Sequence, residues 1–310
     1  MTKWVSKISP KYVEKRDWPK YNEELVLHGE FLLDFEWINK GWQEELAKMN
    51  YEKKGAPFKF PNSLIELQAV WAQIIDYREV EGITRKVCEA SMIPDFNDYS
   101  TIFRRVNKLE TNLVLPENKT LSIVSDGSGM KFDNAGEYRK NKYGENSRKK
   151  FLKVIVTANP ITKELLDCDV FIDDEDVSEP DISQTHMEKL IEQGFEINQF
   201  FGDGAFDKKK LFNFLQKHNI ESGIKIRSNA SGKADGSMRR AREVKIYKTK
   251  GYVEWAKKKK YGLRWIIEVI FSAVKTKFGE KNRSKKPENC KKEAKRKFWA
   301  YQKIKNYTTT

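Results

Sequence analysis

Residues 120–127 read TLSIVSDG, residues 151–160 read FLKVIVTANP and residues 164–174 read ELLDCDVFIDD. All three runs are rich in aliphatic and β-branched residues, and residues that favour turns separate them. This pattern is typical of an antiparallel meander. The runs therefore predict the first three strands of a sheet.

The following residues change to an alternation of helix and strand. Residues 183–196 (SQTHMEKLIEQGFE) predict a helix, 197–205 (INQFFGDGA) a strand, 206–219 a helix and 221–227 (ESGIKIR) a further strand. Three strands followed by alternating helices and strands are typical of an α/β domain. We therefore predict a mixed sheet flanked by helices.

The pattern of the N-terminal residues favours helix over strand. Residues 62–77 (NSLIELQAVWAQIIDY) are apolar on almost every side, which predicts a buried helix. A short segment at 113–119 then makes a plausible boundary before the first strand. We predict an all-α region over 1–115 and an α/β domain over 116–310 that ends in a basic helix.

Two short helices are expected within the N-terminal region, over 81–92 and 99–110. Together they give the outline of a helix-turn-helix at about 80–109, in which Arg104 and Arg105 would contact DNA. Two amphipathic helices joined by a turn that contains proline are also a common way to pack a core. The sequence leaves both interpretations open.

The basic residues are concentrated near the C-terminus. The chain has 59 Lys and Arg against 45 Asp and Glu, a formal charge of +14. Residues 241–310 hold 22 basic and 6 acidic residues, a balance of +16, so the first 240 sum to 37 minus 39, or −2. Such a block indicates binding of a polyanion, nucleic acid first, or a solvated charged face. The basic pattern of the tail over 281–307 fits both phosphate binding and packing on the domain.

Composition narrows the class of protein further. No apolar run approaches the ~18 residues that cross a bilayer, and no apolar segment typical of a signal peptide follows Met1. We expect a cytoplasmic protein without a membrane partner. The three histidines and three cysteines show no ligand spacing, so a metal would have to be held by oxygen atoms.

Two aspartates stand at expected strand ends, each before a glycine. Asp126 follows the first strand and Asp203 follows the strand that begins near residue 197. Taken singly, Asp126 would be a turn former and Asp203 a helix cap. Their shared position is what draws attention to them.

The segment 261–275 has the spacing Y-x2-R-x3-E-x6-K, formed by Tyr261, Arg264, Glu268 and Lys275. In a long helix expected from about 252 to 278, these residues fall on one narrow polar face, and apolar residues fill the rest. A glutamate on a packed face needs a partner, and a metal ion is a natural one. The spacing of Arg264 and Glu268 also fits a salt bridge.

The order Asp126, Asp203, Glu268 and the Y-R-E-K spacing resemble the DDE transposases of bacterial and archaeal insertion sequences, in the broad grouping of insertion-sequence families four and five. The resemblance covers nearly the whole chain and includes the stretches YNEELVLHGE, GAPFKFPNSLI, PDFNDYSTIFRRVNKL, YRKNKYGENSRKKFLKVIV and GDGAFDKKKLFNFL. One departure is the sequence around Asp126, SDGSG, which leaves the local turn geometry open.

The resemblance implies a ribonuclease H-like fold with Asp126, Asp203 and Glu268 as catalytic carboxylates. They would bind two Mg²⁺ ions, for which Mn²⁺ could substitute, with Asp126 touching both. Two such ions support in-line displacement at phosphorus without a covalent enzyme intermediate. Arg264 and Lys275 would hold phosphates near the cleaved bond, and Tyr261 would contact the transposon-end strand.

The resemblance also implies the partners. The protein would cleave at the terminal inverted repeats of an insertion sequence and join the freed ends to target DNA, as a homodimer located at the nucleoid. The N-terminal helices would recognise the ends or mediate dimerisation. Two alternatives remain: a DNA-binding repressor of the same descent without catalysis, and a structure-specific nuclease of ribonuclease H-like fold.

Asp203 and Glu268 are 65 positions apart, which indicates an insertion over about 221–258. Two strand-like pieces, GIKIR and EVKIY, flank a Gly/Ser-rich loop, so we expect a small β-rich insertion. It resembles an insertion in some relatives that covers DNA near the site. Arg239 and Arg240 are among the basic residues expected to contact transposon-end DNA there.

Overall fold

The structure is a computed structural model that describes residues 17–132, 151–172 and 175–308. Within them a mixed sheet has the strand order β3-β2-β1-β4-β5, and β6 pairs with β1. Strands β1, β2 and β3 are antiparallel, while β4 and β5 continue the sheet parallel to β1. The bounds are Thr120–Phe132 (β1), Phe151–Ala158 (β2), Leu165–Ile172 (β3), Glu196–Gly202 (β4), Glu221–Ile224 (β5) and Lys281–Asn282 (β6). The predicted mixed sheet is confirmed.

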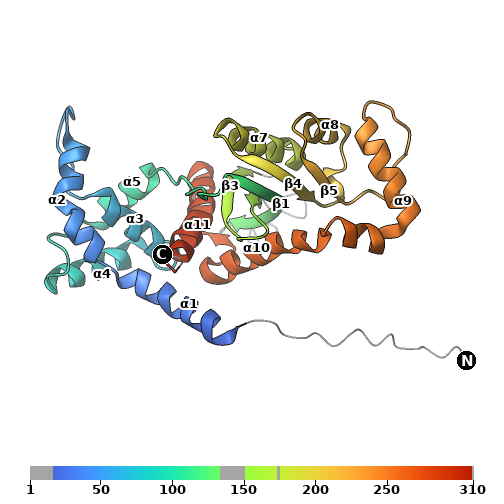
Figure 1. The fold of residues 1–310 in the computed structure, drawn as a ribbon. Helices are drawn as coiled ribbons and strands as arrows, with labels where there is room; N and C mark the ends of the chain where they lie inside the picture. Colours follow the sequence, from blue (N-terminus) through green and yellow to red (C-terminus); the bar gives the residue numbers. More distant parts are fainter. Residues whose placement is uncertain (1–16, 133–150, 173–174, 309–310) are drawn as a thin grey trace, which may run out of the picture.

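Helices cover both faces of the sheet (Figure 1). On one face lie α7 (Glu179–Glu192) and α8 (Lys209–Lys217), and on the other lie α10 (Trp265–Phe278) and α11 (Pro287–Tyr307). The N-terminal region folds into α1 (Trp18–Glu30), η1 (Phe31–Leu33), α2 (Glu36–Asn50), α3 (Asn62–Trp71), α4 (Tyr77–Glu89) and α5 (Tyr99–Lys108). This flanked sheet is the fold class that the sequence predicts.

Two hydrophobic cores form, one on each face of the sheet. The core under α7 and α8 includes Ile123, Phe200 and Phe212. The other is continuous from the N-terminal helices to the sheet and includes Ile65, Val156 and Phe298. The boundary predicted near residue 115 therefore separates two kinds of secondary structure that share one core.

Helix α11 lies between the N-terminal helices and the sheet, and it contacts α1, α3, β2 and β3 (Figure 1). Arg296 and Lys297 of this helix are both 1% exposed. Arg296 donates to the carbonyl of Val106 at 2.8 Å, and Lys297 donates to that of Lys281 at 2.6 Å. Of the two interpretations of the basic tail, packing on the domain accounts for these cations.

Strand β1 is longer than the sequence indicates. It continues past Asp126 to Phe132, because Gly127 and Gly129 stay paired with β2. The expectation that Asp126 stands at the end of its strand is wrong. It stands instead where β1 leaves its parallel neighbour, since the last pair with β4 joins Val124 and Phe201.

The expected β-rich insertion is also wrong. Residues 221–224 form β5, an edge strand of the main sheet, and residues 238–258 form the helical element α9 (Met238–Lys258), which is kinked at Gly251 (φ 73°). Charged and apolar residues alternate in EVKIY, but the buried Ala241 and Val244 are spaced as on a helix, and α9 packs against α8. The side chain of Ser237 caps the helix by accepting from the backbone N–H of Arg240.

The single helix expected over about 252–278 is broken into segments. Helix α9 ends at Lys258, Lys260 has a left-handed backbone (φ 53°), and the 3₁₀ turn η3 (Tyr261–Arg264) precedes α10. Tyr261 and Arg264 therefore lie before the helix that carries Glu268 and Lys275.

The expected helix pair forms as α4 and α5. Residues 90–98 join them, a connection longer than the three- or four-residue turn of a helix-turn-helix. A DNA-reading role for the pair stays a prediction. Among the helices in the described part of the chain, none has the length and apolar character needed to cross a membrane.

Candidate functional site

Asp126 and Asp203 lie side by side because of the strand register. The parallel pairing of β1 and β4 ends at Val124 and Phe201, and each aspartate follows two residues later. Oδ1 of Asp203 accepts the backbone N–H of Ala205 at 2.7 Å, which starts the 3₁₀ turn η2 (Gly204–Phe206). Asp203 therefore caps the following turn, as predicted, and it also lies beside Asp126.

Arg264 joins the first carboxylate to the third. Its Nη1 lies 3.1 Å from Oδ2 of Asp126, and its Nη2 donates to Oε1 of Glu268. The guanidinium is largely buried, at 17% side-chain exposure, whereas the Glu268 side chain is 38% exposed. The salt bridge expected between Arg264 and Glu268 thus extends to Asp126 and brings the carboxylates of β1 and α10 together.

Burial raises the pKa of Asp126 to about 6. Asp203 and Glu179 also contribute to this rise, while the N–H of Gly127, at 2.8 Å, and Arg264 oppose it. A carboxylate that is half-desolvated and faces other carboxylates gains stability from any cation brought close to it.

Tyr261 and Lys275 contact strands of the same sheet. The Tyr261 hydroxyl donates to the carbonyl of Gly202 at 3.3 Å, and its ring packs on Trp255. Burial raises the pKa of this phenol. Nζ of Lys275 donates to Oγ of Ser128 at 2.9 Å, two residues beyond Asp126 on the same face of β1.

The other arginines predicted to contact DNA lie away from this group, and three of them are tied to the protein itself. Arg105 donates to the carbonyl of Phe60 and to Asn62. Arg239 donates to the carbonyls of Leu215 and Ile220, and Arg240 forms a salt bridge with the buried Asp207. Arg104 is exposed and bonds within α5 to Ser100. Their contact with DNA stays a prediction.

A second cluster, not recognised in the sequence, joins β3 to α7. Ligand atoms of Asp167, Asp169 and His186 lie within 4.8 Å of one another. Lys189 and Lys295 form salt bridges with these carboxylates, so the cluster already carries its own cations. The D-x-D alternation in β3 places both aspartates on one face, which is the signal that could have found them.

Buried hydroxyl groups connect this cluster to the residue before Asp126. His186 Nδ1 lies 2.7 Å from Oγ1 of Thr157, which lies 3.1 Å from Oγ of Ser125. Oγ of Ser125 in turn lies 2.5 Å from Oγ of Ser183 on α7. All four side chains are fully buried, so the chain of contacts fixes α7 against β1 and β2.

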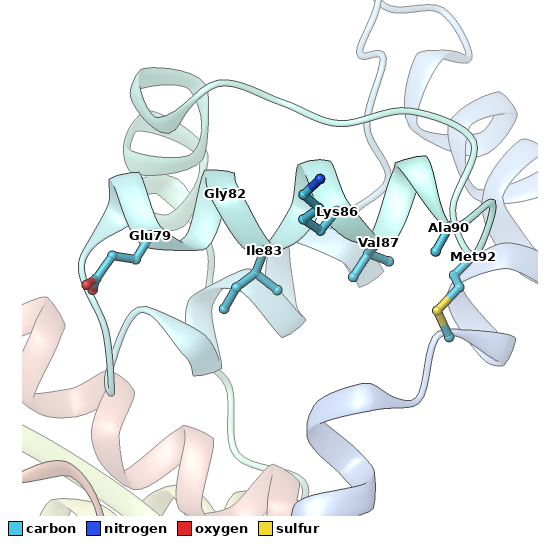
Figure 2. Close-up of a pocket in the computed structure, with 7 residues that line it drawn as sticks. All are labelled: Glu79, Gly82, Ile83, Lys86, Val87, Ala90 and Met92. Atoms are coloured by element: carbon cyan, nitrogen blue, oxygen red, sulfur yellow. The ribbon is translucent and has the colours of Figure 1, made fainter.

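A cavity of about 490 Å³ lies on the N-terminal helices, away from the carboxylates (Figure 2). Residues of α4 and the segment after it line the cavity; the side chains of Ile83 and Val87 extend from one side of the helix, and Met92 lies in the segment that follows. Glu79 and Lys86 are the only charged residues among those that line it. The cavity is not part of the candidate site.

Comparison with known proteins identifies the family of this chain. Residues 118–302 match the family described as the transposase DDE domain, and residues 28–135 match a second family with the same description. The chain therefore belongs to the DDE-domain transposases. It is also similar to a piggyBac transposase, solved by cryo-EM as a synaptic complex with hairpin DNA, with 11% identity and a TM-score of 0.41 over 92% of this chain and 75% of that one.

Proposed function

We propose that the protein is a DNA transposase that cleaves at the terminal inverted repeats of an insertion sequence and joins the freed 3′ ends to target DNA. The observation that carries this proposal is the placement of Asp126 beside Asp203, with Glu268 linked to Asp126 through Arg264. Membership of the DDE-domain transposases supports a catalytic role for these three carboxylates.

The donor set fits divalent metal ions. Carboxylate oxygens are the ligands that Mg²⁺ prefers, and burial, which raises the pKa of Asp126, disfavours an uncompensated negative charge there. Asp126, Asp203 and Glu268 would hold two Mg²⁺ ions, or Mn²⁺ in their place. When bound, such a pair activates a water or a 3′-hydroxyl and stabilises the leaving oxygen.

The protein side chains supply position and charge. Asp126 is fixed by pairing on β1, and Asp203 is fixed by its bond to Ala205. Arg264 would turn from the carboxylates to a DNA phosphate, because a guanidinium binds phosphate in the same bidentate way as carboxylate. Lys275 bonds to Ser128, two residues beyond Asp126 on β1, and would bind a phosphate further along the DNA strand.

The DNA partners follow from the site and the charge. The balance of +16 over residues 241–310 includes the cations of η3 and α10, and Arg264 of η3 bonds to Glu268. Terminal-repeat DNA and target DNA would both approach this face. Because transposition joins two ends, we propose a homodimer at the nucleoid as the active form.

A cleavage assay tests the proposal. Duplex DNA that carries the element's own terminal repeat is incubated with Mg²⁺ or Mn²⁺ and with wild-type protein, Glu268→Gln or Glu254→Gln. Glu254 is the matched control, because it also pairs with a basic residue four positions away. Wild type and Glu254→Gln should nick the 3′ end of the repeat, and Glu268→Gln should be slower by about 10²-fold or more.

Other outcomes of this assay would support one of the two alternative functions. Specific binding of the repeat without cleavage under any metal would identify a repressor. Cleavage that ignores the repeat sequence and yields no joined product would identify a nuclease. Metal-dependent nicking that survives Glu268→Gln would remove Glu268 from the site.

A further inference from the structure

An apolar surface lies open along α4 in the N-terminal region (Figure 2). It consists of three hollows of about 490, 330 and 270 Å³. Ile83 lines the first and the second hollow, Leu33 the second and the third, and Met92 the first and the third, so the three are continuous. Leu33 is 65% exposed, Ile74 46% and Met92 45%. We call this surface the α4 face, and its members are Leu33, Ile74, Gly82, Ile83, Ala90 and Met92.

The α4 face has the character of a contact surface. Exposed apolar side chains that stand alone are common on proteins, but neighbouring ones rimmed by charges are typical of a site for another molecule. The members come from η1, from the segment after α3, from α4 and from the segment after α4. Packing within the chain gathers them in one place and leaves them open to water. A partner that covers them would gain the free energy of burying apolar surface.

The charges beside the α4 face do not suit DNA. Four charged residues line the hollows, of which Asp34, Glu36 and Glu79 are acidic and Lys86 is basic. Nucleic-acid binding depends on an excess of cations that neutralise phosphates. The chemistry of the α4 face therefore fits a protein surface and not a polyanion.

The outward stripe of α4 is complementary to itself. Glu79, Gly82, Ile83, Lys86 and Ala90 fall within about 100° of one another around the helix axis. The midpoint between Glu79 and Lys86 lies between Gly82 and Ile83. A second α4 that crosses this midpoint in the opposite direction therefore brings Glu79 of each copy to Lys86 of the other. This is the arrangement that a two-fold axis requires, because the same patch serves on both sides.

Both charged groups can make this contact. Glu79 caps its own helix through Oε2, which accepts the backbone N–H of Asp76 at 2.8 Å, so Oε1 can serve a second donor. Lys86 pairs with Glu89, but the Lys86 side chain is 79% exposed, and such a surface pair holds its lysine weakly.

The middle of the stripe also has room for a second helix. A Cβ atom on Gly82 would meet nothing within 4 Å, and the same is true of Gly29, which lines the second hollow from α1. The backbone of α4 can thus be approached closely. Because α4 begins just after Ile74 and ends just before Met92, an antiparallel partner brings Met92 of one copy towards Ile74 of the other. Apolar groups then meet apolar groups at both ends.

We propose that the α4 face binds a second copy of this chain, with the two α4 helices antiparallel across a two-fold axis between Gly82 and Ile83. The apolar members form the centre of the interface, and the pairs of Glu79 with Lys86 form its rim. This assigns an interface to the proposed homodimer, and it rests on the proposed function for the need to hold two DNA ends. The contact itself requires neither DNA nor metal.

The first experiment measures the mass of the full chain in solution. Analytical ultracentrifugation without DNA or metal follows the dissociation of the dimer on dilution. Ile83→Asp and Leu33→Asp place a charge in the centre of the interface, so each should raise the dissociation constant about tenfold or more. Ile161→Asp is the control, because Ile161 is 66% exposed in the turn between β2 and β3. It should dimerise as wild type does, and thermal unfolding checks that each variant is folded.

The second experiment exchanges the rim charges at low salt. Glu79→Lys and Lys86→Glu each bring like charges together in a homodimer, so each should weaken it. A mixture of the two variants should form heterodimers, since both rim pairs then join opposite charges. The double variant should dimerise again. The control mixes Glu79→Lys with Arg85→Glu, which changes the charge of α4 outside the stripe and should give no heterodimer.

The outcomes separate this inference from the proposed function. If wild type dimerises through the α4 face but nicks no DNA, the proposed function fails and the interface stands. If wild type nicks DNA but stays monomeric, or if the variants and mixtures dimerise as wild type does, only the interface fails. A monomer whose affinity for end DNA falls in Lys86→Glu would assign the α4 face to DNA and also overturn the inference.

Discussion

Nη1 of Arg264 lies 3.1 Å from Oδ2 of Asp126, although the two residues are 138 positions apart in the sequence. The same guanidinium also binds Glu268. Arg264 therefore supplies the positive charge between two carboxylates of the candidate site. Under the proposed function, a metal ion bound there would take over this charge, and the guanidinium would then be free to bind a phosphate.

This relationship predicts that Arg264→Gln increases the response to Mg²⁺. Without the guanidinium, the carboxylates repel each other more strongly, so metal ions relieve more repulsion in the variant than in wild type. The rise in Tm on adding Mg²⁺, measured by thermal unfolding, should be larger in the variant. Lys275→Gln is the control, since Lys275 bonds to Ser128. An equal or smaller Mg²⁺ response in Arg264→Gln would contradict the prediction.

The raised pKa of Asp126 predicts a pH-dependent cost to stability in metal-free protein. The folded state has a pKa of about 6 and the unfolded state about 3.9, so the folded state binds the proton more readily. Stability contributed by this group is therefore lost as pH rises from about 4 to 6. Asp126→Asn should be more stable than wild type above pH 6 by about 3 kcal/mol, with the difference vanishing below pH 4.

Urea unfolding in the presence of a chelator measures this difference across the pH range. Asp181→Asn is a contrasting control, because the salt bridge with Lys210 lowers the pKa of Asp181. That variant should lose stability at neutral pH. If Asp126→Asn were less stable than wild type at pH 8, the assigned direction would be wrong.

The buried hydroxyl chain predicts a cost for Thr157→Val. The substitution keeps the shape of the side chain but removes the hydroxyl that contacts His186 at 2.7 Å and Ser125 at 3.1 Å. Two buried polar groups lose a partner, so the free energy of unfolding should fall by about 1–3 kcal/mol. Urea unfolding measures it. Thr185→Val, at an exposed position of α7, should change stability far less.

The two neighbouring arginines of α5 should behave differently. Arg105→Ala removes hydrogen bonds to Phe60 and Asn62 and a contact over the ring of Phe58, so it should lower stability. Arg104→Ala should leave stability unchanged, because this side chain is exposed. If α5 contacts DNA, Arg104→Ala should also reduce the salt dependence of end binding by about one phosphate contact. An unchanged salt slope would remove α5 from the DNA interface.

The sequence was sufficient to predict the sheet because its strands carry local signals. The β-branched runs that begin at residues 120 and 151 form β1 and β2, and the helix and strand alternation after residue 178 is present. The carboxylates could be named because their spacing belongs to a family pattern. Their contact through Arg264 depends on the 3₁₀ turn before α10, which the helical spacing did not predict.

The errors have a common physical cause. The alternation in EVKIY is typical of a strand. In the structure Val244 belongs to α9 and is buried in the core under α7 and α8, so tertiary packing outweighs the local strand preference. The sequence placed Gly127 in a turn after the strand. It lies inside β1 instead, because the whole length of β2 pairs with residues 124–131 of β1.

Helix α11 has a consequence for how the protein is made. It covers one face of β2 and β3 and also contacts α1 and α3, yet it follows every one of these elements in the sequence. A ribosome releases the N-terminal helices and the sheet before their shared core can close. Nascent chains should therefore expose apolar surface until synthesis passes residue 307, and copies shortened before α11 should aggregate instead of competing for DNA.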